Sequence, residues 1–202
     1  MAKTLSMLLA AVLLSACASL VTPDVSSETA ALKSGGYKLD PNHASFIFKI
    51  NHLGFSSFVG RFERFDASLD FDEADPAKAR VEAVIDTTSL DVANDDFAKT
   101  LTGPKWFDAA KFPQAVFRST SIETTGDNTG TMTGDLTLHG VTRPISLDVT
   151  FNGGANDILR HGYVVGFSAV GTINRDEFGV DRFDGVISDE VKIEIEAEFE
   201  KS

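Results

Sequence analysis

The chain has 202 residues, 43% of them hydrophobic, which is enough for one all-β domain with a real core. Its formal net charge is -12 and no cluster of Lys and Arg is longer than a pair. This excludes nucleic-acid-binding proteins, which need such clusters to replace counterions. Sixteen Phe accompany one Trp and two Tyr. Phenylalanine has no polar group, so this composition fits either an ordinary core or the wall of a dry cavity.

Residues 1–16 have the features of an export signal. They contain Lys3, a run of apolar and small residues and no acidic residue, and the run is too short to span a bilayer as a helix. The sequence Leu14-Ser15-Ala16-Cys17 resembles a bacterial lipobox, in which the cysteine carries a diacylglyceryl group. We therefore predict a periplasmic lipoprotein that is acylated at Cys17 and anchored to a membrane. Ala18 stands where aspartate would direct retention, which favours the outer membrane.

The alternative is an ordinary secretory signal that is cleaved nearby and leaves Cys17 in the discarded part or as a stray thiol. Cys17 is the only cysteine, so the lipobox interpretation excludes disulfides, CxxC redox chemistry and cysteine metal sites from the folded domain. Residues 17–35 are rich in Ser, Thr and Ala and show no sustained period, so we expect a flexible tether there. The folded domain is then expected over residues 36–202.

The clearest secondary-structure signal is a hairpin over residues 134–151. Leu136 and Leu138 alternate with polar residues, and after a turn at residues 140–144 apolar residues again occupy every second position. The same alternation recurs on both sides, most regularly over residues 191–199, whose opposite face is almost wholly charged. Because two strands cannot bury one apolar face alone, we predict an antiparallel sheet that curves or closes on itself.

Two segments interrupt this pattern. The apolar parity of a long strand over residues 58–72 switches between Phe62 and Phe65, which predicts a β-bulge near Glu63-Arg64 of the kind that bends a sheet into a barrel. Residues 94–111 have a helical period broken by Gly103-Pro104, which predicts two short helices, the first capped by Asn94 or Asp95. These helices either cover one end of a barrel or simply connect two strands.

No catalytic or metal site is predicted. The histidines at positions 43, 52, 139 and 161 lack the close spacings of a zinc site. The chain has no GxSxG motif and no feature that would activate a serine, so we do not expect an enzyme. His52 shares strand parity with Phe46 and Phe48, and its imidazole would either bond the head group of a ligand or be satisfied at the barrel rim.

Arg175 follows a long predicted strand and has two interpretations. Its guanidinium either meets a polar or phosphorylated head group at the mouth of a cavity, or pairs at the surface with Asp176 or Glu177. We favour the surface pair.

Five segments together resemble the YceI-like polyisoprenoid-binding family: YKLDPNHASFIFKINHLGFSSFVGRF, WFDAAKFPQAVF, GDLTLHGVTRPISL, INRDEFG and SDEVKIEIEAE. The resemblance covers residues 37–198 and implies an all-β fold with minor α. It implies an antiparallel lipocalin-like β-barrel with one or two short helices over one end, exported to the periplasm and holding an isoprenoid. Thr100-Leu101 stands where the family often has His-Leu, so a role of that histidine does not carry over.

The predicted function is non-catalytic binding and transport of a long isoprenoid or similar lipid at the periplasmic membrane surface. The alternatives are an accessory protein acting with a quinone in envelope redox or stress metabolism, and a structural lipoprotein whose barrel is filled by side chains. A bound isoprenoid or quinone would be the ligand rather than a cofactor, and a homodimer is left open. The predicted ligand-binding residues are Phe46, Phe48, Ile50, His52, Phe62, Trp106, Phe107, Leu136, Leu138, Phe167, Arg175 and Phe178.

Overall fold

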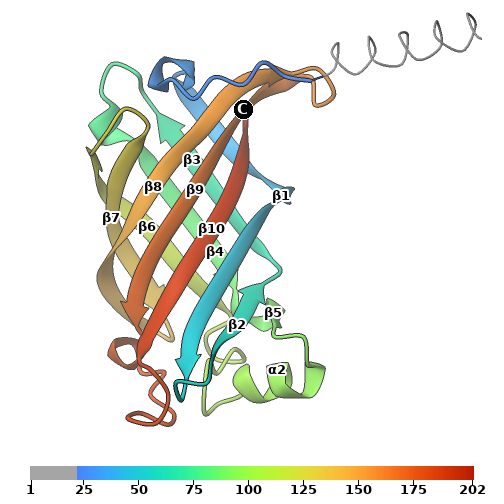
Figure 1. The fold of residues 1–202 in the computed structure, drawn as a ribbon, viewed down its shortest axis with the longest axis vertical. Helices are drawn as coiled ribbons and strands as arrows, with labels where there is room; N and C mark the ends of the chain where they lie inside the picture. Colours follow the sequence, from blue (N-terminus) through green and yellow to red (C-terminus); the bar gives the residue numbers. More distant parts are fainter. Residues whose placement is uncertain (1–21) are drawn as a thin grey trace, which may run out of the picture.

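The computed structural model describes residues 22–202, which form a closed antiparallel β-barrel (Figure 1). The strands are hydrogen-bonded in the order β10-β9-β8-β7-β6-β4-β3-β1-β2-β5, and an additional pairing of β10 with β1 closes the sheet. β2 and β3 follow one another along one position of the wall, and β4 and β5 along the next, so the wall is eight strands around. The predicted lipocalin-like barrel is confirmed. The strands are β1 (Gly35–His52), β2 (Ser56–Phe62), β3 (Phe65–Phe71), β4 (Arg80–Asp86), β5 (Leu90–Asp91), β6 (Gln114–Thr124), β7 (Thr129–Leu138), β8 (Val141–Asp157), β9 (Gly162–Asn174) and β10 (Glu190–Lys201).

Closure of the barrel depends on the pairing of the first and last strands. β1 and β10 are in register from Tyr37 opposite Lys201 to Ile50 opposite Val191, with one irregularity in β1 after Leu39. The alternation predicted for β10 is present, since its apolar side chains are directed into the barrel and its charged ones into solvent. Pairing on both edges leaves the closed sheet without a free edge over this stretch, which removes a template for aggregation.

The hairpin of β7 and β8 turns more tightly than the sequence suggests. Leu138 pairs with Val141, so only His139 and Gly140 form the turn, and both have positive φ, 52° and 79°. Positive φ at both central residues is the geometry of a type I′ turn, whose twist matches that of the flanking strands. Pro144, expected in the turn, lies within β8 opposite Asp135.

The predicted bulge at Glu63-Arg64 is instead a break between two strands. β2 pairs with the C-terminal half of β1 and β3 with its N-terminal part, and the two residues between them leave the ladder. Their amides find other acceptors: Glu63 N donates to Ser89 O and Arg64 N to Ser89 Oγ, both at 3.0 Å. The apolar parity does switch between Phe62 and Phe65. A bulge and a break between strands give the same switch, and only the hydrogen-bond partners of the two residues distinguish them.

One of the two predicted helices forms. Helix α2 (Asp95–Leu101) is capped by Asn94, whose side chain accepts from Phe97 N at 3.0 Å. The second is wrong: residues 103–112 form successive turns. Asp108 adopts a positive φ of 44°, which is incompatible with a right-handed helix, and its amide donates back to Gly103 O at 2.9 Å.

The described part of the predicted tether packs on the barrel. Residues 29–31 form a 3-10 turn, η1 (Thr29–Ala31), and Ser26 exchanges two backbone hydrogen bonds with Gly154. The hydroxyl of Tyr163 donates to Ala31 O, and Leu32 is buried. Thus residues 22–34 are attached to the barrel, and β1 begins at Gly35, one residue before the predicted start of the domain. The export signal, Cys17 and the start of the tether lie outside the described residues.

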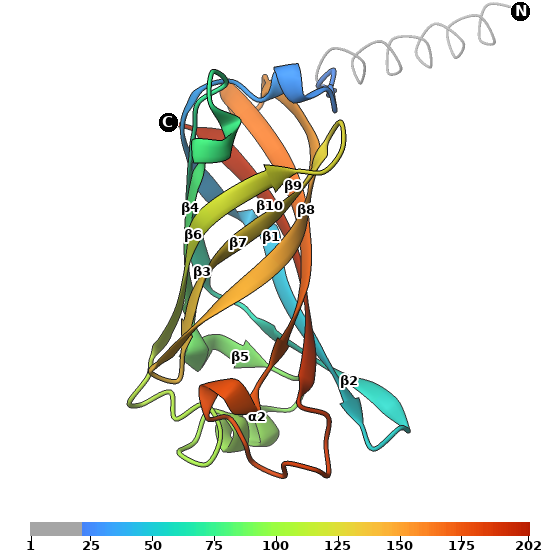
Figure 2. The same ribbon diagram turned by 90° about the vertical axis from the view of Figure 1, so that its left-hand side faces the viewer.

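The barrel therefore has two distinct ends (Figure 2). The α2 end carries α2, the β1–β2 turn and the loop between β9 and β10, which contains η4 (Asp176–Phe178). The η1 end carries η1, the β8–β9 turn and the 3-10 turn η2 (Pro76–Lys78); η3 (Thr87–Ser89) joins β4 to β5. Among residues 22–202, no helix has the length and apolar character needed to cross a membrane.

Candidate functional site

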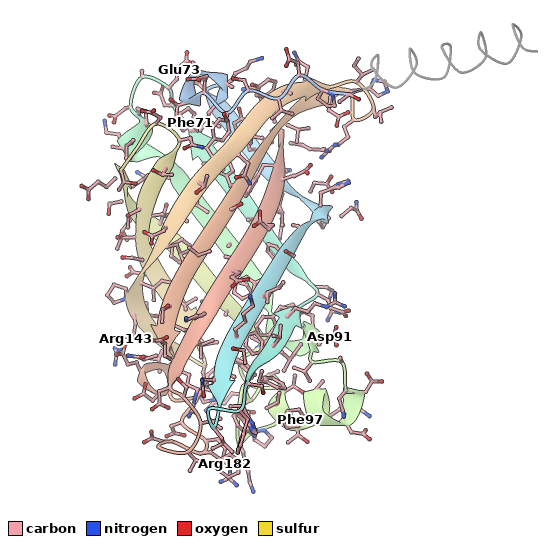
Figure 3. All side chains as sticks on the ribbon, in the orientation of Figure 1. Phe71, Glu73, Asp91, Phe97, Arg143 and Arg182 are labelled. Carbon is pink, nitrogen blue, oxygen red and sulfur yellow. The ribbon has the colours of Figure 1, made fainter. Side chains whose placement is uncertain are left out.

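The barrel encloses a cavity of about 940 Å³ that reaches from one end to the other. Its wall consists of the inward-directed side chains of the strands, which are apolar along the middle of the barrel. Polar lining residues occur at the two ends. His52, Ser56 and Arg175 lie at the α2 end, whereas Thr29, Glu73 and Asp127 lie at the η1 end. In Figure 3 Phe71 and Glu73 mark the η1 end, and Phe97 and Arg182 mark the α2 end.

Eleven of the twelve predicted ligand-binding residues line this cavity. They are Phe46, Phe48, Ile50, His52, Phe62, Trp106, Phe107, Leu136, Leu138, Phe167 and Arg175. The exception is Phe178, which is buried in the core at 1% exposure but does not line the cavity. Phe178 lies in η4 rather than on a strand, so strand parity does not apply to it. Whether the other residues contact a ligand stays a prediction.

A cluster of phenylalanine rings forms the wall near the α2 end. The Phe62 ring lies edge-on to Phe46, with centroids 5.8 Å apart, and edge-on to Phe107 at 5.6 Å. Gly60 is opposite Phe48 in the β1–β2 ladder, and a Cβ there would lie 2.3 Å from Phe48 Cζ. The glycine thus leaves room for the ring to lie flat across the neighbouring strand.

Further aromatic side chains line the cavity beyond those predicted. Phe58 and Phe65 were visible in principle, because each continues the inward parity of its strand. Phe97 and Phe183 were not, because they come from helix α2 and from a loop that only the fold brings to the mouth. Glu73 and Asp127 likewise lie in turns at the η1 end and carry no local signal.

Arg175 is a buried structural residue at the α2 end. Its Nη1 donates to Val180 O at 2.6 Å and to Arg182 O at 3.0 Å, its Nη2 to Ile187 O at 3.2 Å, and its Nε to Ser188 O at 3.1 Å. Its Nη2 also lies 2.7 Å from Asp189 Oδ1. Four N–H groups of the guanidinium thus donate to backbone carbonyls, and its charge is paired with the Asp189 carboxylate. The predicted surface pair with Asp176 or Glu177 is wrong, because the side chain turns inward beneath the loop.

The loop held by Arg175 covers the mouth of the cavity. Phe183 in this loop faces Trp106 from the segment after α2, with ring centroids 6.0 Å apart. Both residues line the cavity. Desolvation raises the pKa of the Asp189 carboxyl, and repulsion by Asp184 and Asp176 adds to this, against the attraction of Arg175. The mouth is bordered by this loop and by the segment after α2 as well as by α2 itself.

The histidines are dispersed over the molecule. His52 is exposed at the mouth, His43 Nδ1 lies 2.6 Å from Asp40 Oδ2 on β1, and His139 packs against the ring of Phe112. His161 lies in the β8–β9 turn at the η1 end. Over residues 22–202, no group of three or more His, Cys, Asp or Glu residues could hold a metal ion.

A closed eight-stranded antiparallel barrel with one long apolar cavity and a covered mouth defines a lipocalin-like β-barrel protein. The chain belongs to the YceI-like family, since the model of the YceI-like domain matches residues 37–199. The resemblance of the five sequence segments is thereby confirmed.

Similar proteins agree with this membership. The chain is 41% identical over 138 residues to a UPF0312 protein of Pseudomonas syringae pv. tomato, covering 68% of this chain and 71% of that protein. It is 40% identical over 164 residues to a UPF0312 protein of Yersinia pestis, covering 80% and 84%.

Solved structures share the barrel. Burkholderia cenocepacia BcnA superposes with a TM-score of 0.71 at 26% identity, over 79% of this chain and 98% of that one. The Campylobacter jejuni YCEI protein gives 0.67 at 30% identity, over 76% and 91%. A polyisoprenoid binding domain from Saccharophagus degradans gives 0.62 over 82% and 98%, and at 16% identity it shows the fold alone.

Proposed function

We propose that the protein binds and carries one long isoprenoid, or a similar lipid with an uncharged head group, inside the barrel and without catalysing a reaction. The observation that carries the proposal is the cavity of about 940 Å³, lined by apolar side chains along its length. Ligand pockets commonly measure about 300 to 1,000 Å³. A structural lipoprotein whose barrel is filled by its own side chains would lack such a space. The description of one structural neighbour as a polyisoprenoid binding domain agrees with an isoprenoid ligand.

The charges along the cavity favour an uncharged head group. Glu73 and Asp127 line the η1 end, and two carboxylates would repel a phosphate. At the α2 end four N–H groups of Arg175 donate to backbone carbonyls and its charge is already paired with Asp189, so this side chain offers little attraction to a second anion. A quinone, phenol or alcohol needs no counter-charge and can accept from or donate to His52 or Ser56 at the mouth.

The energetics point to carriage and exchange rather than to accumulation. Burying a methylene group from water is worth about 0.8 kcal/mol, but an isoprenoid leaving a bilayer starts from an equally apolar environment. The net gain from the apolar wall is therefore small. A protein kept beside the membrane gains from high local lipid concentration. For this reason we also propose export to the periplasm and acylation of Cys17, with the outer membrane as the destination, on the strength of the lipobox-like sequence.

Extraction and mass determination test the proposal. We expect native mass spectrometry of the purified protein to show a bound species, and organic extraction to release an isoprenoid. Delipidated protein offered equal amounts of a polyprenol and its monophosphate should bind mainly the polyprenol. Preference for the phosphate would refute the uncharged head group. Absence of lipid from the native protein, together with no binding of either compound, would refute lipid carriage altogether.

A further inference from the structure

The α2 end exposes an unusual group of apolar side chains around the mouth of the cavity. Among residues 22–202, ten large apolar side chains are exposed, and half of them lie on three segments at this end. The mouth rim consists of Leu53 and Phe55 in the β1–β2 turn, Phe97 in α2, and Phe183 and Val186 in the loop before β10. Phe55 is 87% exposed, so almost its whole ring faces solvent. Figure 3 places Phe97 and Arg182 together at this end.

The mouth rim continues the apolar surface of the cavity. Phe97 and Phe183 line the cavity and yet are 40% and 52% exposed, so each joins the interior to the outside. Phe97 packs edge-on against Phe58 of the wall, with centroids 5.7 Å apart. A lipid leaving the cavity here would therefore pass along apolar side chains.

The backbone displays two of these side chains at a conformational cost. Leu53 and Phe183 have φ of 57° and 59°, in the left-handed region that bulky residues avoid. Gly54 and Gly185 in the same two turns also have positive φ, which glycine adopts without strain, whereas Leu53 and Phe183 adopt it at a cost. Strained positions of this kind persist where the surrounding structure fixes them and are concentrated at functional sites.

The segments at this end carry charges of both signs, with an acidic excess. Arg182 covers the face of the Phe183 ring at 4.5 Å and is followed closely by Asp184, while Lys99 of α2 pairs with Asp96 at 3.1 Å. Acidic residues outnumber basic ones on α2 and this loop, seven (Asp95, Asp96, Asp176, Glu177, Asp181, Asp184 and Asp189) against three (Lys99, Arg175 and Arg182), so the surface has no attraction for anionic lipids. An apolar rim with an excess of acidic charge favours a zwitterionic bilayer over an anionic one, because anionic head groups would repel it.

We propose that the mouth rim docks onto the surface of a zwitterionic phospholipid bilayer, so that a lipid can pass between bilayer and cavity without entering water. The proposal extends the proposed function by naming the surface through which cargo enters. The bilayer is favoured over a protein partner because the exposed rim is continuous with the wall of the proposed lipid cavity.

The test uses a chain that starts at Thr22, which retains every strand and the β1–β10 closure. Flotation with phosphatidylcholine vesicles that contain no isoprenoid measures docking alone. We expect binding that Phe55→Ser weakens about tenfold, since burial of that ring is lost. Two matched controls, Val170→Ser on the side of the barrel and Leu159→Ser at the η1 end, remove similarly exposed side chains and should leave binding unchanged.

Three results would overturn the proposal: no flotation of the parent chain, equal loss in the Leu159→Ser control, or binding that appears only with anionic lipid and is abolished by salt. Absence of flotation would indicate that the mouth rim binds a protein partner instead of a bilayer. Insertion into the bilayer is measured separately with a Phe55→Trp chain that also carries Trp106→Phe, so that its fluorescence comes from residue 55 alone. Residue 55 lies outside the cavity lining, so this fluorescence reports on the mouth rim. Brominated phospholipid should quench this tryptophan.

Failure of docking and failure of lipid carriage are distinguishable. Ala83→Phe narrows the middle of the cavity, where Ala83 is part of the wall, and lies away from the mouth rim. We expect this variant to lose isoprenoid but to float with vesicles as the parent chain does. Loss of flotation in a folded Ala83→Phe chain would instead attribute vesicle binding to uptake of phospholipid by the cavity and overturn docking.

Discussion

Nη2 of Arg175 lies 2.7 Å from Oδ1 of Asp189, and this ion pair joins the residue after β9 to the residue before β10. The same guanidinium binds four backbone carbonyls of the loop between them. One buried side chain thus organises the segment that covers the mouth of the cavity. The arginine resembles a ligand contact in the sequence, yet its donors are used by the protein itself.

Replacing this side chain should destabilise the protein strongly. Arg175→Met keeps an aliphatic stem but leaves Asp189 and four carbonyls without their partner, so we expect a loss of about 3 kcal/mol or more in the free energy of unfolding. Arg175→Lys should fall between, because an ammonium keeps the charge opposite Asp189 but cannot reach all four carbonyls. Urea unfolding measures both values. A loss below about 0.5 kcal/mol in Arg175→Met would contradict the structural role.

The pH dependence of stability should report Asp189. Its pKa is raised above 3.8, because desolvation, helped by repulsion from Asp184 and Asp176, outweighs the attraction of Arg175, so the folded state binds the proton more tightly than the unfolded state. The contribution is therefore favourable at low pH and is lost as pH rises from about 4 through the folded pKa. We expect wild type to lose stability relative to Asp189→Asn over that rise. A constant difference, or one of opposite slope, in urea titrations would count against the raised pKa.

A larger side chain in the wall should displace lipid without unfolding the barrel. The Phe167 ring lines the cavity between Phe151 and Phe199, at centroid distances of 5.3 and 6.0 Å. Overpacking a solid core costs about 1 to 3 kcal/mol, whereas a cavity can accept the extra ring. We expect Phe167→Trp to retain the stability of the lipid-free protein and to co-purify with less lipid. Clear destabilisation with no lipid in either protein would indicate a solid interior.

Phe178 provides the matched control for this experiment. It is buried but lies off the cavity lining, so Phe178→Leu should lower stability by about 1 to 2 kcal/mol through imperfect packing. The amount of lipid per folded molecule should stay at the wild-type level. Equal lipid loss in the two variants would show that the assay reports stability rather than occupancy.

Anchoring by Cys17 is tested by fractionation of cells. Cys17→Ser removes the thiol that the lipobox-like sequence offers for acylation, and two hydrophobic chains suffice for stable membrane attachment. We expect the variant to leave the membrane fraction, with the precursor either retained uncleaved or released as a soluble form. Wild-type association with the outer membrane by a processed Cys17→Ser chain would refute lipid anchoring.

The sequence determined the barrel because strand parity is a local property. Alternation of period two assigns every strand residue to the inside or the outside, and closure follows once no apolar face can be left unpaired. For this reason the inward residues of β1 and β7, such as Phe48 and Leu136, were predicted correctly as cavity lining. The acidic outer face of β10 followed in the same way.

Only the tertiary structure decided the ends of the barrel. Phe178 and Arg175 lie beyond a strand, where parity no longer applies, and their surroundings come from segments far away in the chain or from the fold of a loop. Residues 22–34 have a linker composition, yet they attach to β8 and to Tyr163 because backbone groups there are free to bond. Periodicity predicts which face of a strand is buried, but contacts between loops depend on the closure of the whole sheet, which brings together residues with no local pattern in common.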